Sequence, residues 1–337
     1  MSLPPLTRPK WSSSALLSTV LLVLLALVPL YARSVADPFI ITLITRILIF
    51  AIAATSLNLI LGYGGLVSFG HALFLGLGVY AAAIMGFHGI TNGWLQLLVT
   101  LVACGIIGLV TGSIALRTSG ISFIMITLAF AQMFYFLFVS LSQYGGDDGL
   151  RMVSGSDFNG IILTESLTLY FTSFAILCLS LYACHRLVHS RFGVVVRASK
   201  INDQRMKALG YSTFRYRLTV YVISAALCGV AGLLYGNLTQ FASPSYMSWT
   251  TSGELIVMVM LGGMGTLFGP LFGALAMILT EEWLKSITEH WMVIFGPLIV
   301  VVVTTSRLGL MGMLTALDNR RRRKPIPASV ASNQEAS

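Results

Sequence analysis

Long apolar segments recur along almost the whole chain, and they constrain its fold more than any other feature. Seven of them lie at 15–31, 39–61, 66–87, 94–116, 121–141, 166–183 and 218–235. An α-helix rises about 1.5 Å per residue, so about 20 residues cross the roughly 30 Å of hydrocarbon in a bilayer. Inside lipid, a segment must satisfy its own backbone hydrogen bonds, as a helix does. We therefore expect an all-α polytopic membrane protein.

The composition supports a membrane protein and argues against a nucleic-acid partner. Of the 337 residues, 56% are hydrophobic and 10% are charged, whereas charged residues make up about a quarter of soluble domains. The net charge of +9 would suggest nucleic-acid binding in a soluble protein. Here the basic residues fall in loops and tails, as the positive-inside rule describes. We expect the lipid bilayer, and no nucleic acid, as a partner.

Two loops of opposite charge indicate one topology. With the N-terminus inside, five crossings place the loop 142–165 outside, where four acidic residues accompany Arg151. The sixth segment leads back to the loop 186–217, which carries eight Lys or Arg residues and one acid, Asp203. An acidic outer loop and a basic inner loop agree with each other.

The first apolar segment has two interpretations. Arg8 and Lys10 precede it, and the small residues Ser34-Val35-Ala36 follow it as at a signal-peptide cleavage site. We favour a retained helix over a cleaved one. Both alternatives leave the orientation of the later segments unchanged.

The last third of the chain is irregular. Two short apolar segments, 254–261 and 266–280, are separated by a glycine-rich break, and a further apolar segment follows at 291–305. A single crossing at 254–280 would put the basic run 320–324 outside, so an even number of crossings is required. The two short segments are therefore a re-entrant pair or two abbreviated spans.

These segments define the expected organisation of the chain. We predict ten hydrophobic helical segments with both termini inside, forming a single transmembrane domain over residues 1–324. The residues 325–337 contain two prolines and small polar side chains, and they are expected to form a disordered tail.

Two glycine clusters resemble each other and suggest an internal repeat. NLILGYGGLVSFGHALFLGLGVY (58–80) and LGGMGTLFGPLFGA (261–274) each contain a glycine cluster, then Phe-Gly, then Leu-Phe. Gly70 and Gly269 would be equivalent positions near helix starts. Close helix packing explains most glycines of such a chain, but broken backbone at membrane depth requires protein or a water-filled cavity beside it. The candidate pathway residues are Asn58, Gly62, Gly64, Gly65, Ser68, His71, Gly262, Gly263, Gly265, Gly269 and Pro270.

Ionisable residues within the apolar segments are scarce, namely Arg46, His71 and Glu254. A charge at the bilayer centre costs about 2.5–3.5 kcal/mol on insertion scales, so such residues usually face the protein interior. For His71 a structural hydrogen bond and a solute contact are both open, and we favour the first. The scarcity of acid–base pairs argues against a secondary carrier driven by protons or sodium.

The basic loop is the candidate docking segment. Residues 199–209 are expected to form a short helix that Ser199 caps and that Gly210 ends in the left-handed conformation. A rigid basic helix between spans is suited to docking a partner, although a charge run can also be only a solvated face. His185 and His189 are spaced for a metal pair, but we favour polar residues at a membrane exit and no metal site. The four cysteines are interpreted as small buried hydrophobic residues.

Catalytic motifs are absent from the sequence. It contains no GxxxxGK[ST] phosphate loop, no HExxH and no GxSxG. We therefore expect a protein that is not an enzyme, and whose energy comes from a partner or a gradient.

Four motifs together resemble a known family. They are SLNLILGYGGLVSFGHALFLGLGVYAAA (56–83), GGDDGL (145–150), RASKINDQRMKALG (197–210) and VMLGGMGTLFGPLFGA (259–274). In this order, over nearly the whole chain, they resemble the LivM-like permease subunits of branched-chain amino acid ABC importers. Where that family usually has small residues in the third motif, this chain has Arg205 and Met206.

The resemblance implies a system of several subunits in a bacterial inner membrane. This chain would form a heterodimer with a second, related permease, together with two cytoplasmic ATPases that hold ATP and Mg and a periplasmic solute-binding protein; the chain itself would need no cofactor. The loop 186–217 would dock the ATPase through Arg197, Ser199, Asp203, Ala208, Leu209 and Gly210. The binding protein would dock on Gly145, Gly146, Asp147 and Asp148.

The expected function is import by alternating access, with branched-chain amino acids or related small polar solutes as cargo. Relatives also carry urea, short amides and aromatic acids, so the resemblance leaves the solute open. The alternative is a secondary carrier or channel for a small solute.

Overall fold

The computed structural model describes residues 19–29, 38–152, 154–290, 293–297, 300 and 309–312. The first described helix is Thr19–Pro29. It is followed by α2 (Pro38–Asn58), the π-helical turn η1 (Leu59–Tyr63), α3 (His71–Phe87), α4 (Gly93–Ala115), α5 (Ile121–Ser140), the 3-10 turns η2 (Ser142–Tyr144) and η3 (Gly146–Asp148), β1 (Leu150–Arg151), β2 (Asp157–Phe158), β3 (Ile161–Ile162), α6 (Ser166–His189), α7 (Arg191–Ile201), α8 (Asp203–Ala208), α9 (Thr213–Thr239), β4 (Phe241–Ala242), η4 (Pro244–Met247), α10 (Trp249–Gly262) and α11 (Gly269–Ile287).

The all-α polytopic fold is confirmed. In the described part of the chain, 5 helices are long and apolar enough to cross a membrane, namely Phe39–Tyr63, α4, α5, α6 and α9. The helix Thr19–Pro29, α3 and α10 are apolar but shorter. The predicted span 291–305 lies mostly outside the described residues, as do the possible cleavage site and the tail 325–337.

Several observed boundaries differ from the predicted ones. Helix α6 continues to His189, beyond the apolar run, and α3 begins only at His71 because residues 64–70 form an irregular turn. Helix α10 begins at Trp249, so it has 14 residues and a length of about 21 Å.

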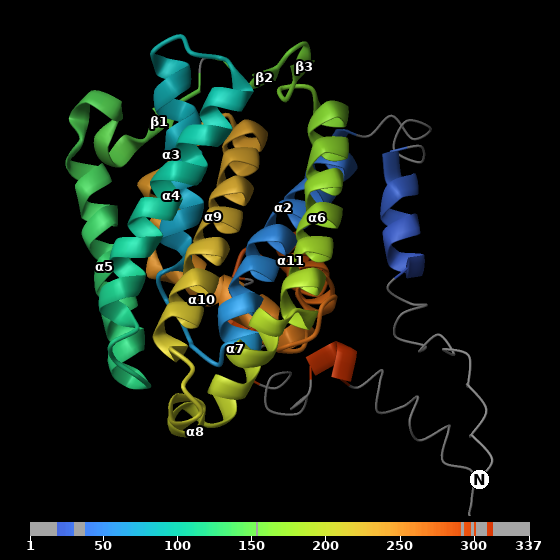
Figure 1. Ribbon diagram of the computed structural model, residues 1–337. Coiled ribbons are helices and arrows are strands. Elements are labelled where there is room, and N and C mark those ends of the chain that lie inside the picture. The colour runs from blue at the N-terminus through green and yellow to red at the C-terminus, as the bar shows by residue number, and fades with distance from the viewer. Residues whose placement is uncertain are drawn as a thin grey trace, which may run out of the picture.

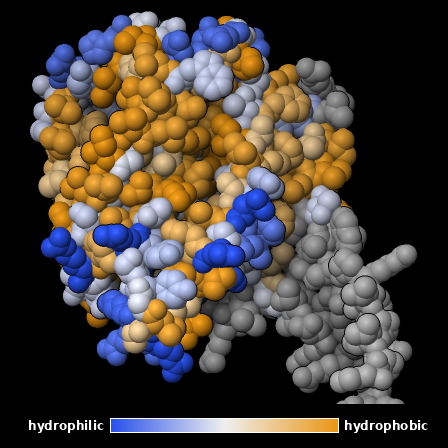
Figure 2. Space-filling view, viewed as in Figure 1, coloured by the Kyte–Doolittle hydropathy of each residue, from blue (hydrophilic) through white to orange (hydrophobic). Residues whose placement is uncertain are grey.

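The surface has the pattern of a membrane protein. Apolar side chains of α4 and α5 such as Leu98, Ile106 and Phe136 are about 60% exposed. The face in Figure 2 carries a broad hydrophobic belt, and hydrophilic residues gather above and below it. Helix α8 lies at one end of the bundle, and the β1, β2 and β3 segments lie at the other (Figure 1).

Helix α9 is the central helix, and it packs on α2, α3, α4 and α6. A Cβ atom on Gly232 would collide with the carbonyl oxygen of Leu75, and one on Gly78 would collide with that of Gly229. Helices α3 and α9 therefore touch backbone to backbone, as small residues allow in membrane bundles.

The end that carries the acidic loop is ordered by short strands and buried polar side chains. Strand β1 pairs with β4, and β2 pairs with β3. Ser156 is buried; its amide donates to Asn237 Oδ1 over 2.9 Å, and its hydroxyl donates to Gln96 Oε1. These bonds fasten the loop 142–165 to α4 and α9.

Candidate functional site

The two glycine clusters, 62–65 and 262–265, meet in space, and we call them the glycine breaks. Helix α2 ends in the π-turn η1, after which Gly65 has a φ of 71°. Helix α10 ends at Gly262, and the following chain passes through Gly263 with a φ of 118°. Two segments about 200 residues apart in the sequence are thus broken at the same place.

Asn58 joins the two breaks. Its side chain is buried; its Nδ2 donates to the carbonyl of Thr266 over 2.8 Å, and its Oδ1 accepts from the amide of Gly265 at 3.0 Å. One amide side chain thus satisfies two backbone groups that the broken helix leaves unpaired.

Glycine is required at the breaks because backbone meets backbone there. A Cβ atom on Gly62 would collide with the amide of Gly265, and one on Gly262 would collide with the carbonyl of Gly269. On the same hairpin, Gly273 meets the carbonyl of Met258, so α10 and α11 pack antiparallel. In this structure these candidate pathway residues are close-packed.

The remaining glycines of the breaks have their own neighbours. A Cβ atom on Gly64 would meet the carbonyl of Ile60, and Gly263 follows α10 and opens the turn that leads to α11, which begins at Gly269 and the buried Pro270. Gly70 immediately precedes α3. Both Gly70 and Gly269 therefore lie at helix starts, as the internal repeat predicts.

Lys200 of α7 reaches the first break from the basic loop. Its Nζ donates to the carbonyl of Gly62 over 2.8 Å, and its aliphatic stem lies against Gly65. The loop 186–217 and the glycine breaks are therefore in direct contact. Sequence analysis does not single out Lys200, because it is one of eight basic residues in that loop.

Ser68 and His71 form a second buried polar cluster beside the first break. The Nε2 of His71 lies 2.7 Å from the hydroxyl of Ser224, which itself donates to the carbonyl of Ser56. Because that hydroxyl has a single proton, His71 Nε2 carries the proton of the shared bond. Its Nδ1 faces the Ser68 hydroxyl at 3.5 Å. The fully buried ring supports the structural role that we favoured.

The basic loop contains two short helices, so the prediction of one helix over 199–209 is wrong. Asn202 adopts an extended conformation and caps α8, because its Oδ1 accepts from the amide of Arg205 at 2.9 Å. Ser190 caps α7. Ser199 is no cap: it is buried within α7, where its hydroxyl donates to the carbonyl of Val196. Gly210 does follow α8 in the left-handed conformation, with a φ of 86°.

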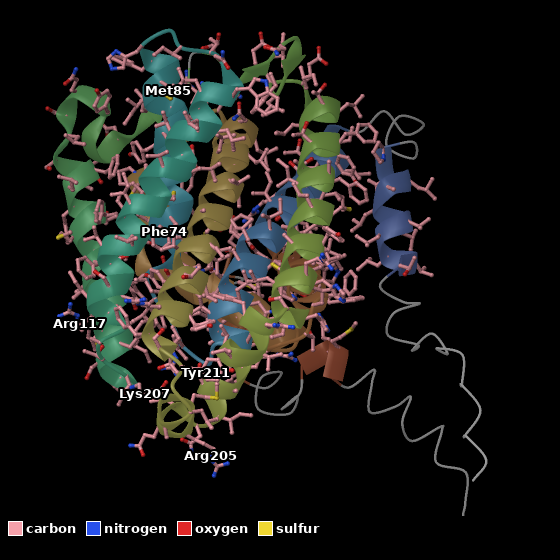
Figure 3. The ribbon with its side chains drawn as sticks, viewed as in Figure 1. Phe74, Met85, Arg117, Arg205, Lys207 and Tyr211 are labelled. Atoms are coloured by element: carbon pink, nitrogen blue, oxygen red, sulfur yellow. The ribbon has the colours of Figure 1, made fainter. Side chains whose placement is uncertain are left out.

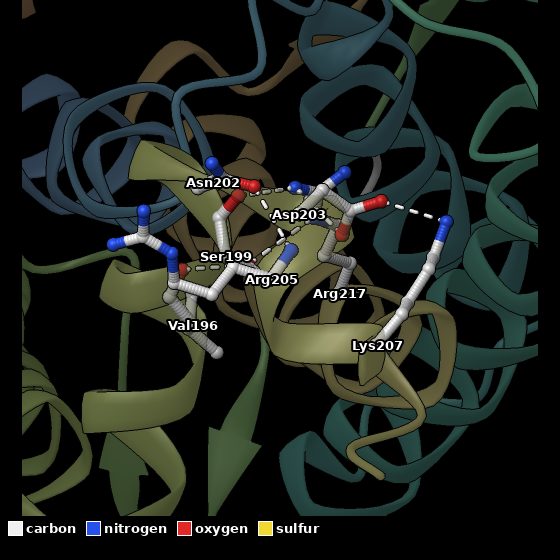
Figure 4. Close-up of polar contacts among 7 residues, drawn as sticks. All are labelled: Val196, Ser199, Asn202, Asp203, Arg205, Lys207 and Arg217. Carbon is white, nitrogen blue, oxygen red and sulfur yellow. Dashed lines mark hydrogen bonds and ion pairs between the residues drawn. The ribbon is translucent and has the colours of Figure 1, made fainter. Parts of the chain in front are cut away.

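Arg217 of α9 holds α7 and α8 together (Figure 4). Its guanidinium donates to the carbonyl of Ser199 over 2.8 Å and pairs with Asp203 at 3.3 Å. Lys207 pairs with Asp203 at 2.7 Å. Burial alone would raise the pKa of the Asp203 carboxyl, but hydrogen bonds from Lys207 and Thr213 and the charges of Arg217 and Lys207 outweigh it and lower that pKa.

This pKa predicts how the loop responds to acid. A carboxyl whose folded pKa is lowered stabilises the fold above its unfolded pKa of about 3.9, and the stabilisation is lost as the pH falls through the folded pKa. We expect Asp203→Asn to lower the hydrogen-exchange protection of α8 at pH 7 by about two- to fivefold, the scale of an exposed ion pair. Wild type should approach the variant only below about pH 4. Equal protection in both proteins at pH 7 would refute this role of Asp203.

The loop presents apolar side chains among basic ones. Ile201 is 88% exposed and Leu209 is 67% exposed. Arg197 and Ala208 are also exposed, and Arg205 and Lys207 lie at this end of the molecule (Figure 3). Met206 is half-buried. Of the predicted coupling residues, Ser199 thus supports the loop from within, and Asp203 pairs with Lys207 and Arg217.

The opposite end presents the acidic motif. Gly145 and Gly146 have φ values of 87° and 52°, which bend the chain around η3. The side chains of Asp147 and Asp148 are exposed. Elsewhere, His185 and His189 stack with ring centroids 4.2 Å apart, and within the described residues no three metal-ligating side chains form a group.

Comparison with known proteins identifies the family. The family model described as "Branched-chain amino acid transport system / permease component" matches residues 39–303. The chain belongs to this permease family. The matched region of this permease includes both glycine breaks and the basic loop, so the resemblance inferred from the four motifs is confirmed.

The permease is similar to curated proteins over most of its length. It is 26% identical over 318 residues to the high-affinity branched-chain amino acid transport system permease protein LivM of Escherichia coli K12, which covers 86% of this chain and 75% of the relative. It is 25% identical over 290 residues to LivH of the same organism, covering 78% and 91%. A probable LivM of Methanocaldococcus jannaschii is 25% identical over 276 residues, covering 69% and 77%. No solved structure matches significantly.

Proposed function

We propose that this permease is the membrane subunit of an ATP-driven importer for branched-chain amino acids or closely related solutes. A second permease, two ATPases that hold ATP and Mg, and a solute-binding protein would complete the system. The chain would lie in a bacterial inner membrane, with α8 facing the cytoplasm and the acidic loop facing outward. The similarity to both LivM and LivH supports the pairing of two permeases.

One observation carries the proposal. Lys200 connects the exposed docking loop directly with the glycine breaks, so a partner that moves α7 and α8 acts on the place where two membrane helices are interrupted. Large switching motions are commonly rigid shifts of such packed elements. Alternating access would follow if these shifts open the bundle first to one side and then to the other.

The source of energy can be tested in cells. We expect uptake to persist when the proton motive force is collapsed and ATP is maintained. Immediate loss of uptake under these conditions would instead indicate a secondary carrier.

Leu209→Glu tests the docking surface. Leu209 is 67% exposed, so the change should leave the fold intact while placing a charge in an apolar contact, and we expect co-purification of the ATPase to fall at least about tenfold, as for an interface anchor. Ser119→Glu is the matched control, because Ser119 is exposed in the α4–α5 loop. Normal ATPase recovery with Leu209→Glu would contradict the assignment.

A further inference from the structure

Charged residues gather on α2, α10 and α11, away from the glycine breaks. Arg46 of α2 pairs with Glu281 of α11 at 3.3 Å, and Lys285 pairs with the same carboxylate at 2.6 Å. The carboxyl of Glu254 in α10 interacts electrostatically with Glu281, Arg46 and Lys285. Charges at membrane depth are costly, and those that persist commonly serve function.

Helix packing does not account for two members of this cluster. Arg46 has five N–H donors, yet in the described structure its hydrogen bonding amounts to one bond to Glu281, and its buried Nε has no partner. Glu254 is exposed, and among the described residues no ion pair or hydrogen bond engages it. A structural ion pair explains Glu281 but leaves a guanidinium and a carboxylate with unused capacity.

Aromatic rings lie next to these charges. Arg46 sits over the ring of Phe50 at 5.8 Å, and Phe50 meets Tyr235 edge-on at 5.3 Å. Tyr235 meets Tyr246 at 5.0 Å and lies in the field of both Arg46 and Glu254. Tyr235 and Tyr246 are half-buried, so they offer apolar surface beside the charged groups.

The cluster lies toward the end that carries the acidic loop. Arg46 is eight residues from the start of α2 at Pro38, a distance of about 12 Å along the helix. Tyr246 belongs to η4, which directly follows the strand β4 that pairs with β1. A solute that enters from that end would reach these groups before the glycine breaks.

We propose that this cluster binds the head group of an amino acid zwitterion on its way through the membrane. The guanidinium of Arg46 takes the α-carboxylate, as its planar fork favours, and the carboxylate of Glu254 takes the α-ammonium. The apolar side chain packs on Tyr235 and Tyr246. This inference rests on the proposed transport function, because it names the residues that hold the transported solute.

The test is equilibrium binding of labelled L-leucine to the permease–ATPase complex in nanodiscs, without the binding protein. Two analogues compete: leucinamide lacks the carboxylate, and 2-hydroxy-4-methylpentanoate lacks the ammonium. We expect both to displace leucine poorly from wild type. Glu254→Gln should weaken leucine binding about tenfold or more and abolish the preference over the hydroxy acid, because a site built for a charged donor then lacks its partner.

Two further variants guard against loss of structure. Arg46→Lys keeps the charge beside Glu281 but removes the bidentate fork, so it should reduce the preference over leucinamide without abolishing it. Glu282→Gln neutralises an acid that pairs with Lys285 at 3.7 Å and should bind leucine as wild type does. Unchanged binding in Glu254→Gln, or no leucine binding to wild type, overturns the inference. The proposed function fails separately, if uptake does not depend on ATP.

Discussion

Valine in place of Gly262 should strongly destabilise the folded permease. A Cβ atom at this position collides with the carbonyl of Gly269 and comes within 3.0 Å of the amide of Gly273. Both are backbone atoms of α11, so no rotamer change relieves the clash and the α10–α11 hairpin must separate. We expect the free energy of unfolding to fall by more than about 3 kcal/mol, beyond ordinary overpacking of a core.

Gly253 provides the matched control in the same helix. A Cβ atom there has no neighbour within 4 Å, and valine has a slightly higher helix propensity than glycine. Thermal unfolding of the purified proteins should therefore show a large loss for Gly262→Val and almost none for Gly253→Val. Equal melting temperatures would show that α10 and α11 do not touch as described.

Alanine in place of Asn58 should abolish uptake while leaving most of the protein folded. The change removes the donor to Thr266 and the acceptor for Gly265. Because these backbone groups are half-buried, we expect a loss of about 1–3 kcal/mol, the cost of unsatisfied polar groups. The larger effect is on transport, since the two glycine breaks are no longer held in register.

Asn58→Asp separates the two bonds, because a carboxylate can accept from Gly265 but cannot donate to Thr266. It also places a buried negative charge against the Thr266 carbonyl oxygen, so its stability should lie below that of Asn58→Ala. Thr55→Ala is the control, since the buried Thr55 hydroxyl donates within α2, to the carbonyl of Ala51. Uptake should be measured per folded complex. Wild-type uptake by Asn58→Ala would remove the glycine breaks from the transport mechanism.

The spans could be predicted from the sequence because each is set by a local property, the length of an apolar run. The glycine breaks could also be predicted from a local property, the clustering of glycines, and Asn58 is among the predicted pathway residues. Boundaries failed where polar residues continue a helix: α6 extends through Arg186 to His189, since lipid no longer limits it there. Apolar length does not predict how far a helix projects from a membrane.

The basic loop shows the limits more clearly. The predicted helix over 199–209 places Asn202 in its interior, but the Asn202 side chain accepts from the backbone amide of Arg205 and starts a new helix. The roles of Lys200 and Arg217 depend on contacts across 138 and 18 residues, which no periodicity encodes. Arg46 and Glu254 were noted as costly, yet only the packing of α2, α10 and α11 places them in one cluster.

The bond from Lys200 to the carbonyl of Gly62 also bears on the direction in which information travels. Energetic coupling between two sites is reciprocal, so each changes the other's equilibrium by the same factor. If an ATPase seated on α7 and α8 shifts the balance at the glycine breaks, a solute that shifts that balance must alter the affinity of the same ATPase for the loop. Under the proposed function, Lys200 therefore couples the two sites in both directions. The ATPase acts on the glycine breaks through it, and solute bound in the membrane path changes how tightly the ATPase binds.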